Sequence, residues 1–257
     1  MLLIMGLASQ SLNWFPYFYE PIVQQNYYVI RFDNRDIGLS DRIDPATWAT
    51  NPYSLEDMAK DAIGLLDALN IKTAHIVGVS MGGMIAQRIA ISHPSYVRSL
   101  TSLTSSADSA NLGFDPSPNP PFDPAQLPPL DIQLQFWRLL SGSRYPFDAQ
   151  RYRELYQEAF VIRQGYNPHC LTHHFTAIQR SGSRMAELSS ITAPTLVVHG
   201  TEDPLIPEAH AALYAQQIPN ATYLALDGVG HEIPEGAAPT VLPAILDLFS
   251  RASFGTT

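Results

Sequence analysis

The chain has 257 residues, with 15 basic and 24 acidic side chains and a formal net charge of −9 at pH 7. This length suits one α/β domain with an insertion, and a hydrophobic share of 46% is typical of a folded core and excludes disordered and coiled-coil classes. The negative charge repels phosphate backbones and anionic lipid, so we expect neither a nucleic-acid nor a membrane partner.

The first ten residues, MLLIMGLASQ, predict a buried strand. The apolar run ends at Gly6 and Ser9 and no basic residue precedes it, which argues against a secretory signal. No later run approaches the roughly 20 apolar residues that span a bilayer. The single cysteine, Cys170, excludes an internal disulfide framework and fits a reducing compartment. We therefore expect a soluble, cytoplasmic protein.

Short apolar runs alternate with helical patterns in the first and last parts of the chain. This alternation predicts an α/β fold with a mostly parallel central sheet and helices on both of its faces. Because the runs are rich in apolar and β-branched residues, we expect the strands to be buried on both faces. The predicted strands are Leu2–Met5, Tyr27–Phe32, Ala74–Val79, Ser99–Thr104, Thr195–His199 and Thr222–Leu226.

Three helices follow from apolar residues at helical spacing. In SLEDMAKDAIGLLDALN, Ser54 is the expected N-cap and Asn70 the expected stop. A second helix follows the third strand, and Pro94 ends it. The predicted helices are Leu55–Leu69, Met81–Ser92 and Pro243–Arg251.

The alternation ends after Thr104. Seven of the fourteen residues in 116–129 are proline, which favours a stiff, extended connector. Helical patterns without a convincing strand follow as far as Glu187. We predict a helical cap with a proline-rich entry over residues 105–190, inserted between two parts of the core, residues 1–104 and 191–257.

Ser80 stands at the predicted strand-to-helix turn in HIVGVSMGGMIAQ. A nucleophilic serine needs a nearby base and donors for the oxyanion that forms. Gly78, Gly82 and Gly83 would relieve the Cβ clashes of such a strained turn. Taken alone, the motif fits a glycine-rich turn with a bystander serine equally well.

Candidates for the base and its acid lie at the ends of later strands. His231 follows the last strand in LDGVGHEIP, and Asp203 follows the preceding strand in LVVHGTEDPLIP. Asp108, after the fourth strand, and Asp227, close to His231, are rival acids. Asp227 is too near His231 along the loop to orient its ring well, so Asp203 is the preferred acid.

Five motifs together resemble the α/β-hydrolase family, and in particular its serine hydrolases and esterases, along nearly the whole chain. They are the M-G-L turn after the first strand, FDNRDIGLS, GVSMGG, HGTEDPLIP and GVGHEIP. The segments LLIMGL, VIRFDNRDIGLS, HIVGVSMGG and WRLLSGSRYPFD resemble the branch that includes the aclacinomycin methylesterases. The chain order Ser, Asp, His is the order of this family.

The resemblance implies a Ser-Asp-His triad. Ser80 would be the nucleophile, His231 the general base and then acid, and Asp203 the carboxylate that orients the imidazole. The backbone N–H groups of Leu7 and Met81 would form the oxyanion hole. Family members also carry a β-hairpin before the strand that here begins at Leu2, and this sequence lacks one; we expect a misplaced start or a truncation.

The resemblance implies that the protein hydrolyses a carboxylic ester of a small to medium hydrophobic molecule, for example a methyl ester. The reaction would proceed through an acyl-enzyme and would need no cofactor. Lactone or C–C bond hydrolysis, perhydrolysis and acyl transfer would use the same triad. A ligand-binding sensor that has kept the triad is an alternative of another class. The sequence carries no signal for an oligomeric state.

Other polar and aromatic clusters have simpler explanations. NPHCLTHHF offers His169, Cys170, His173 and His174 at near-helical spacing, but a triad hydrolase needs no metal and no third ligand is evident, so we expect a polar cap helix. Asp33, Arg35 and Asp36 are expected to form a structural turn of ion pairs and capping bonds. Some of the cap aromatic residues should line an apolar pocket over Ser80, the candidates being Phe136, Trp137, Tyr145, Phe147, Tyr152 and Tyr156.

Overall fold

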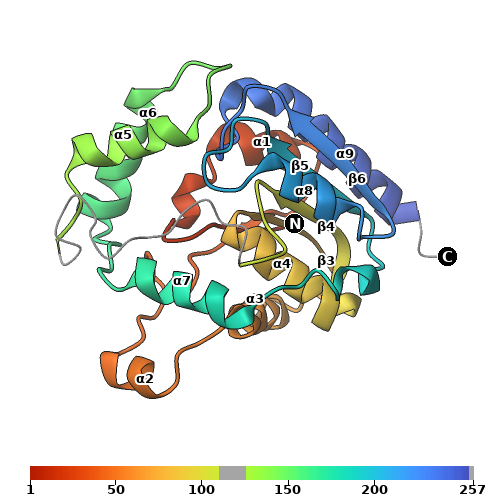
Figure 1. Cartoon of the computed structure of the whole chain (residues 1–257), viewed down its shortest axis with the longest axis horizontal. Helices are drawn as coiled ribbons and strands as arrows, with labels where there is room; N and C mark the ends of the chain where they lie inside the picture. Colours follow the sequence, from red (N-terminus) through yellow and green to blue (C-terminus); the bar gives the residue numbers. More distant parts are fainter. Residues whose placement is uncertain (110–125, 255–257) are drawn as a thin grey trace.

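The structure is a computed structural model that describes residues 1–109 and 126–254 (Figure 1). Within these residues, six strands form one parallel sheet in the order β2-β1-β3-β4-β5-β6. The strands are β1 (Leu2–Ile4), β2 (Ile30–Arg31), β3 (Ala74–Val79), β4 (Val97–Leu103), β5 (Thr195–Gly200) and β6 (Ala221–Leu226). The predicted α/β fold with a mostly parallel sheet is confirmed.

The two outer strands correct the prediction that all strands are buried on both faces. The inner strands β1, β3, β4 and β5 are buried along most of their length. In β2, however, Arg31 is exposed, and in β6 only Leu226 is buried. Each outer strand pairs on one side only within the described part of the chain, so less of it is covered. β2 is also shorter than predicted, because only Ile30 and Arg31 pair with β1.

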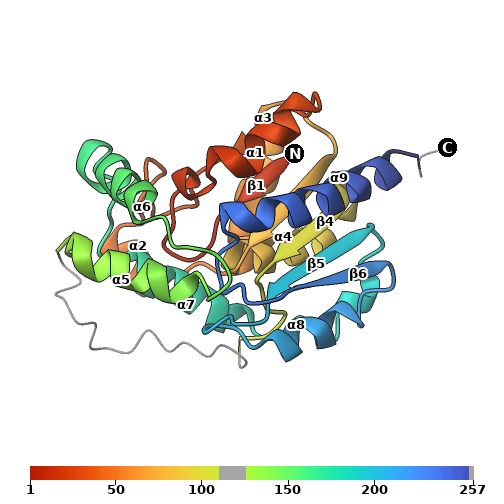
Figure 2. The ribbon, with the colours of Figure 1, turned by 90° about the horizontal axis from the view of Figure 1, so that it is seen from above.

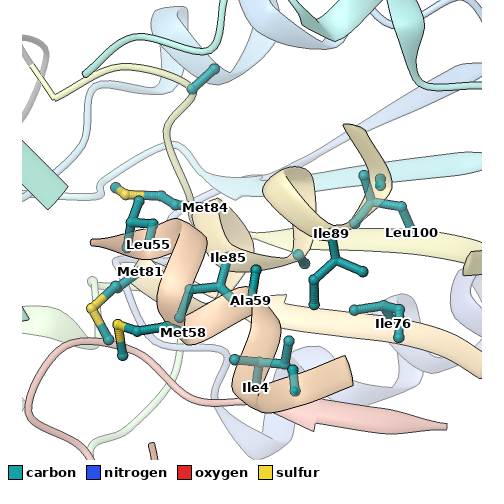
Figure 3. Packing of buried hydrophobic residues seen from close by; sticks show 14 of the residues in the cluster. Ile4, Leu55, Met58, Ala59, Ile76, Met81, Met84, Ile85, Ile89 and Leu100 are labelled. Carbon is teal, nitrogen blue, oxygen red and sulfur yellow. The ribbon is translucent and has the colours of Figure 1, made fainter. Parts of the chain in front are cut away.

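Successive residues of the strands point to opposite faces of the sheet and enter two separate cores. Leu2 and Ile4 belong to one cluster of buried residues, and Leu3 belongs to the other. Figure 3 shows part of the first cluster, where Met58 and Ile85 pack near Ile4. Helices therefore cover both faces of the sheet (Figure 2). The first face carries α3 (Leu55–Ala68), α4 (Met81–Ser92) and α8 (Glu208–Ala215), and the second carries α1 (Pro16–Gln24) and α9 (Ala238–Phe254).

The ends of α3 follow the sequence signals. Ser54 Oγ accepts a hydrogen bond from the backbone N–H of Asp57, and Asp57 Oδ2 accepts one from the backbone N–H of Ser54, which makes a capping box. Asn70, just past the helix, has a φ of 57°, the left-handed conformation that ends many helices. The predicted cap and stop are both confirmed.

The last helix begins earlier than predicted. α9 starts at Ala238, and Pro243 lies inside it. A proline at this point removes one backbone hydrogen bond. Val241 and Ile245 on either side of it are fully buried against the sheet, so packing outweighs that loss.

The chain between β4 and β5 supplies the helices of the predicted cap. They are α5 (Leu130–Leu140), α6 (Ala149–Tyr156), the π-helical turn η3 (Gln157–Ile162) and α7 (Cys170–Ser181). α5 and α6 share a small core of their own around Trp137 and Tyr152, whereas Ala177 and Ile178 of α7 join the main core. Of the proline-rich connector predicted over 116–129, residues 116–125 lie outside the described residues. The boundaries at 104 and 190 stay predictions.

Several short elements were not predicted. They are the helix α2 (Pro45–Thr50), capped by Asp44, and the 3₁₀ turns η1 (Ser11–Asn13), η2 (Pro94–Tyr96), η4 (Leu188–Ser190) and η5 (Glu235–Ala237). Among the helices in 1–109 and 126–254, none is both long enough and apolar enough to cross a bilayer.

Candidate active site

Ser80 occupies a strained turn between β3 and α4. Its φ of 55° and ψ of −122° are unusual for a residue with a side chain, and such strain persists only where neighbouring contacts hold it. The backbone N–H of Ser80 donates to the carbonyl oxygen of Leu103 at 2.9 Å. The carbonyl oxygen of Ser80 accepts from Ser105 Oγ at 2.7 Å and from the N–H of Gly83 at 2.9 Å. These bonds fix the serine at the carboxyl end of the sheet.

Glycines let this turn approach the first strand closely. A Cβ on Gly78 would lie 2.1 Å from the carbonyl oxygen of Gly82, and one on Gly82 would lie 2.1 Å from the carbonyl oxygen of Ile4. Gly6, in the M-G-L turn, also lies close to the serine, because a Cβ there would be 3.1 Å from Ser80 Cβ. The turn after β1 and the turn after β3 are therefore in direct contact.

Asp203 and His231 follow the carboxyl ends of β5 and β6 and are in direct contact. His231 Nδ1 donates to Asp203 Oδ2 at 2.7 Å, which leaves Nε2 of the ring as the proton acceptor. The other carboxylate oxygen accepts the backbone N–H groups of Leu205 at 2.8 Å and Ile206 at 3.0 Å. The side chain of Asp203 is fully buried. The carboxylate is thus locked in one orientation toward the imidazole.

A second histidine, His199 on β5, also approaches this carboxylate. Its Nε2 lies 3.1 Å from Asp203 Oδ2 and 2.9 Å from the carbonyl oxygen of Ile206. Burial opposes ionisation of Asp203, but the hydrogen bonds from His199 and His231 hold its pKa well below the usual range. The sequence reasoning missed His199; its place four residues before Asp203, at the end of a buried strand, is the signal that could have found it.

The rival acids lie elsewhere. Asp227 is highly exposed and pairs with Arg144 at 2.9 Å. Asp108 lies near His210, where its charge opposes the lowering of the His210 pKa by burial. Asp203 is the one of the three that the structure places against His231.

The backbone N–H groups of Leu7 and Met81 have no acceptor within the described residues. Met81 is the first residue of α4, where N–H groups have no partner inside the helix. The M-G-L turn is held from two sides. Asn34 Nδ2 donates to the carbonyl oxygen of Met5 at 2.9 Å, and the N–H of Ala8 donates to His174 Nδ1 at 3.1 Å. Both N–H groups are thus available to an oxyanion beside Ser80.

His173 and His174 of α7 have partners within the protein. His173 Nδ1 lies 2.9 Å from Asp36 Oδ2, and its ring stacks on Trp48 at 3.7 Å between centroids. His174 Nε2 lies 2.8 Å from the carbonyl oxygen of Arg35, and burial lowers its pKa to about 4, so the ring is neutral. In the part of the chain that the structure describes, no group of three or more His, Cys, Asp or Glu side chains is arranged to hold a metal ion.

The charged turn after β2 consists of structural contacts. Asp33 accepts the backbone N–H groups of Ser11 at 2.7 Å and Leu39 at 3.0 Å. Arg35 forms a two-bond ion pair with Asp61 at 2.6 Å. The turn thus connects neighbouring loops to α3, which is the structural role expected from the sequence.

A cavity of about 630 Å³ lies beside Ser80 and His231. Ser80, His231 and Leu7 line it together with residues of α1, α5 and α7. Of the six cap aromatic residues considered above, the lining includes Phe136, Trp137 and Tyr152; Tyr145, Phe147 and Tyr156 are not part of it. Unpredicted aromatic residues also contribute: Trp14, Phe15, Tyr17, Phe18, Phe160, Tyr166 and Phe175.

The chain is similar to several known hydrolases. Rhodomycin D methylesterase DnrP from Streptomyces peucetius is 32% identical over 91% of this chain and 85% of its own. The putative carbamate hydrolase RutD from Pantoea ananatis is 26% identical over 96% of this chain and 86% of its own. A solved N-acyl homoserine lactone degrading enzyme is 27% identical, with a TM-score of 0.71 over 96% of this chain and 91% of that one. The family described as the alpha/beta hydrolase fold matches residues 1–165 and 135–238, and the chain belongs to that family.

Proposed function

We propose that this protein is a serine hydrolase that cleaves a carboxylic ester through an acyl-enzyme. The observation that carries the proposal is the hydrogen bond from His231 Nδ1 to the buried Asp203, in a loop that lines the same cavity as Ser80. The strained backbone of Ser80 supports the same function, as do the N–H groups of Leu7 and Met81, which have no acceptor among the described residues. The methylesterase and hydrolase names of the relatives support hydrolysis as the reaction class.

In this mechanism Ser80 Oγ attacks the ester carbonyl carbon while His231 Nε2 takes the hydroxyl proton. The carbonyl oxygen becomes an oxyanion, to which the N–H groups of Leu7 and Met81 donate. The tetrahedral intermediate then collapses, and His231 returns the proton to the leaving alcohol. Water then attacks the carbonyl carbon of the acyl-enzyme while His231 takes a proton from it, and the second tetrahedral intermediate collapses as His231 returns that proton to Ser80 Oγ and the acid is released. Every step uses the chain's own residues.

The cavity points to a small or medium hydrophobic ester. About 630 Å³ fits a molecule of drug-like size, and its lining is rich in aromatic and aliphatic side chains. A methyl ester is the first substrate to test, because two of the relatives are methylesterases. A lactone is a cyclic ester open to the same attack, and a structural relative degrades one. We place the reaction in the cytoplasm, which the single, buried Cys170 favours.

A fluorophosphonate probe tests the proposal, because it reacts with a serine only where a base and an oxyanion hole activate it. We expect a stoichiometric label on Ser80, located by peptide mass spectrometry, and none in Ser80→Ala. Ser9 lines the same cavity and makes a matched control, so Ser9→Ala should label normally. A label that persists in Ser80→Ala, or its absence from the unsubstituted protein, would refute the proposal. Methyl esters and homoserine lactones would then be compared as substrates.

A further inference from the structure

The carboxyl group of Glu232 has no task in the mechanism above. Glu232 directly follows His231 and, like it, lines the cavity. Tyr152, from α6 of the cap, also lines the cavity, and its hydroxyl donates a hydrogen bond to Glu232 Oε2. Glu232 is partly buried, so some of its surface remains accessible. Glu232 is thus an acidic residue in a cavity lined mainly by apolar side chains.

No side-chain cation of the described residues neutralises this carboxyl. Arg151, next to Tyr152 in the chain, pairs instead with Glu235 at 2.5 Å and Asp148 at 3.5 Å. Within the described ranges, the bond from Tyr152 is the only side-chain hydrogen bond that Glu232 accepts. Burial raises the pKa of Glu232 to about 7, although the bond from Tyr152 acts to lower it. Its charged form is therefore partly shielded from solvent and has no side-chain counter-ion among the described residues.

We propose that Glu232 forms a subsite for a positively charged group of the ester substrate. This inference rests on the proposed function and adds to it the charge of the substrate. An ammonium group entering the cavity would supply the counter-ion that the protein does not, and a desolvated ion pair is stronger than one in water. The net charge of −9 attracts cations from a distance.

The same carboxyl should exclude negatively charged molecules. An anionic ester would place two like charges in one poorly solvated cavity. The acid released by hydrolysis carries such a charge, so Glu232 would also favour its departure. A role limited to holding the cap through the hydroxyl of Tyr152 predicts neither effect, since that role does not involve the charge of the substrate.

The subsite should depend on pH, because only the carboxylate attracts a cation. Since burial raises the pKa of Glu232 to about 7, the preference for cations should be present above pH 7 and fade as the pH falls below it. The ratio of two esters measured at the same pH cancels any pH effect on the catalytic steps that the two esters share. The titratable and charged groups near Glu232 are His231, Tyr152, Tyr17, Arg151 and Glu235.

The test compares two p-nitrophenyl esters over a series of acyl chain lengths. One acyl chain ends in trimethylammonium, whose charge does not change with pH, and the other ends in the isosteric tert-butyl group. At pH 8 we expect kcat/KM to favour the cation by about tenfold, the size of one charge-assisted contact. In Glu232→Gln, which keeps an acceptor for Tyr152, the ratio should fall to near one.

Tyr152→Phe gives a second, independent reading. It removes the hydrogen bond that lowers the pKa of Glu232, so the preference should persist but set in at a higher pH. A ratio that is the same in the unsubstituted protein and in Glu232→Gln would overturn the inference. An onset that stays at the same pH in Tyr152→Phe would overturn it too.

Binding separates this inference from the proposed function. A non-hydrolysable amide with the trimethylammonium group can be titrated calorimetrically into Ser80→Ala and into Ser80→Ala/Glu232→Gln. We expect the amide to bind about tenfold more weakly to the second protein. Equal affinities would refute the subsite, whatever the hydrolysis assays show. Failure of every ester to react, with a weaker Kd in the second protein, would refute the proposed function alone.

Discussion

The substitution Asp203→Asn isolates the orienting role of the carboxylate. Asp203 accepts hydrogen bonds from His231, His199, Leu205 and Ile206. An asparagine can keep the two backbone bonds through its oxygen, but its NH₂ group then faces the two histidines. His231 can accept from that NH₂ only by moving its own proton to Nε2, where it blocks transfer of the proton from Ser80.

The expected loss follows from this change of tautomer. We expect kcat to fall by on the order of 10³ to 10⁴, equivalent to about 4 to 5.5 kcal/mol of transition-state stabilisation. KM should change little, because the cavity walls are untouched. The assay is steady-state hydrolysis of a p-nitrophenyl ester near pH 8, with circular dichroism to show that the fold is retained.

The rival carboxylates make matched controls for this prediction. Asp227→Asn removes an exposed ion pair with Arg144 and should leave kcat within about twofold, because such pairs contribute little. Asp108→Asn should also leave most of the activity. The reasoning is wrong if activity survives Asp203→Asn and collapses in Asp108→Asn.

Three further predictions concern the turns around Ser80 and their stability. Gly82→Ala should lower the free energy of unfolding by about 3 kcal/mol and Tm by roughly 10 °C, because the new Cβ would clash with the carbonyl oxygen of Ile4. Gly64→Ala in α3 is the control and should leave the free energy of unfolding unchanged or raise it, because a Cβ there meets nothing within 4 Å. Equal losses of stability in the two variants would contradict this explanation. His174→Leu removes the acceptor for the N–H of Ala8 and should lower kcat by at least about tenfold at constant KM. His174→Asn keeps an acceptor near the position of Nδ1 and should retain more of the activity. Equal kcat values in the two variants would contradict the role of His174 in holding the turn that carries the N–H of Leu7. Burial lowers the pKa of His174 from 6.5 to about 4, so between pH 6.5 and pH 4 the unfolded chain binds more protons than the folded one. The free energy of unfolding should therefore fall by about 3 kcal/mol as the pH drops from 6.5 to 4. Urea titrations of His174→Asn should show a smaller fall.

Local signals in the sequence predicted the elements that carry the site. The N-cap at Ser54 and the glycine-flanked turn at Ser80 depend on neighbours in the chain, so pattern alone located them. Lengths that depend on tertiary contacts were less predictable. β2 is short because few of its residues pair with β1, and α9 extends past Pro243 because the sheet buries its flanks.

The supporting residues of the site could not be found by pattern. His199 and Glu232 resemble any strand or loop residue in the sequence, and their roles come from what the fold places against them. His174 lies 166 positions from Ala8, whose N–H it accepts. Contacts of that separation leave no periodic trace. The resemblance to a hydrolase family therefore located the triad candidates. It located neither the polar contacts that orient them nor Glu232, whose carboxyl group has no side-chain counter-ion among the described residues.

The central claim is that Ser80 forms a covalent acyl intermediate. The most direct measurement is rapid acid quenching during turnover of a p-nitrophenyl ester, followed by peptide mass spectrometry. The account predicts a mass increase equal to the acyl group on the peptide that contains Ser80, and no such increase in Ser80→Ala. An acyl group on another residue, or turnover in Ser80→Ala at the rate of the unsubstituted protein, would contradict it.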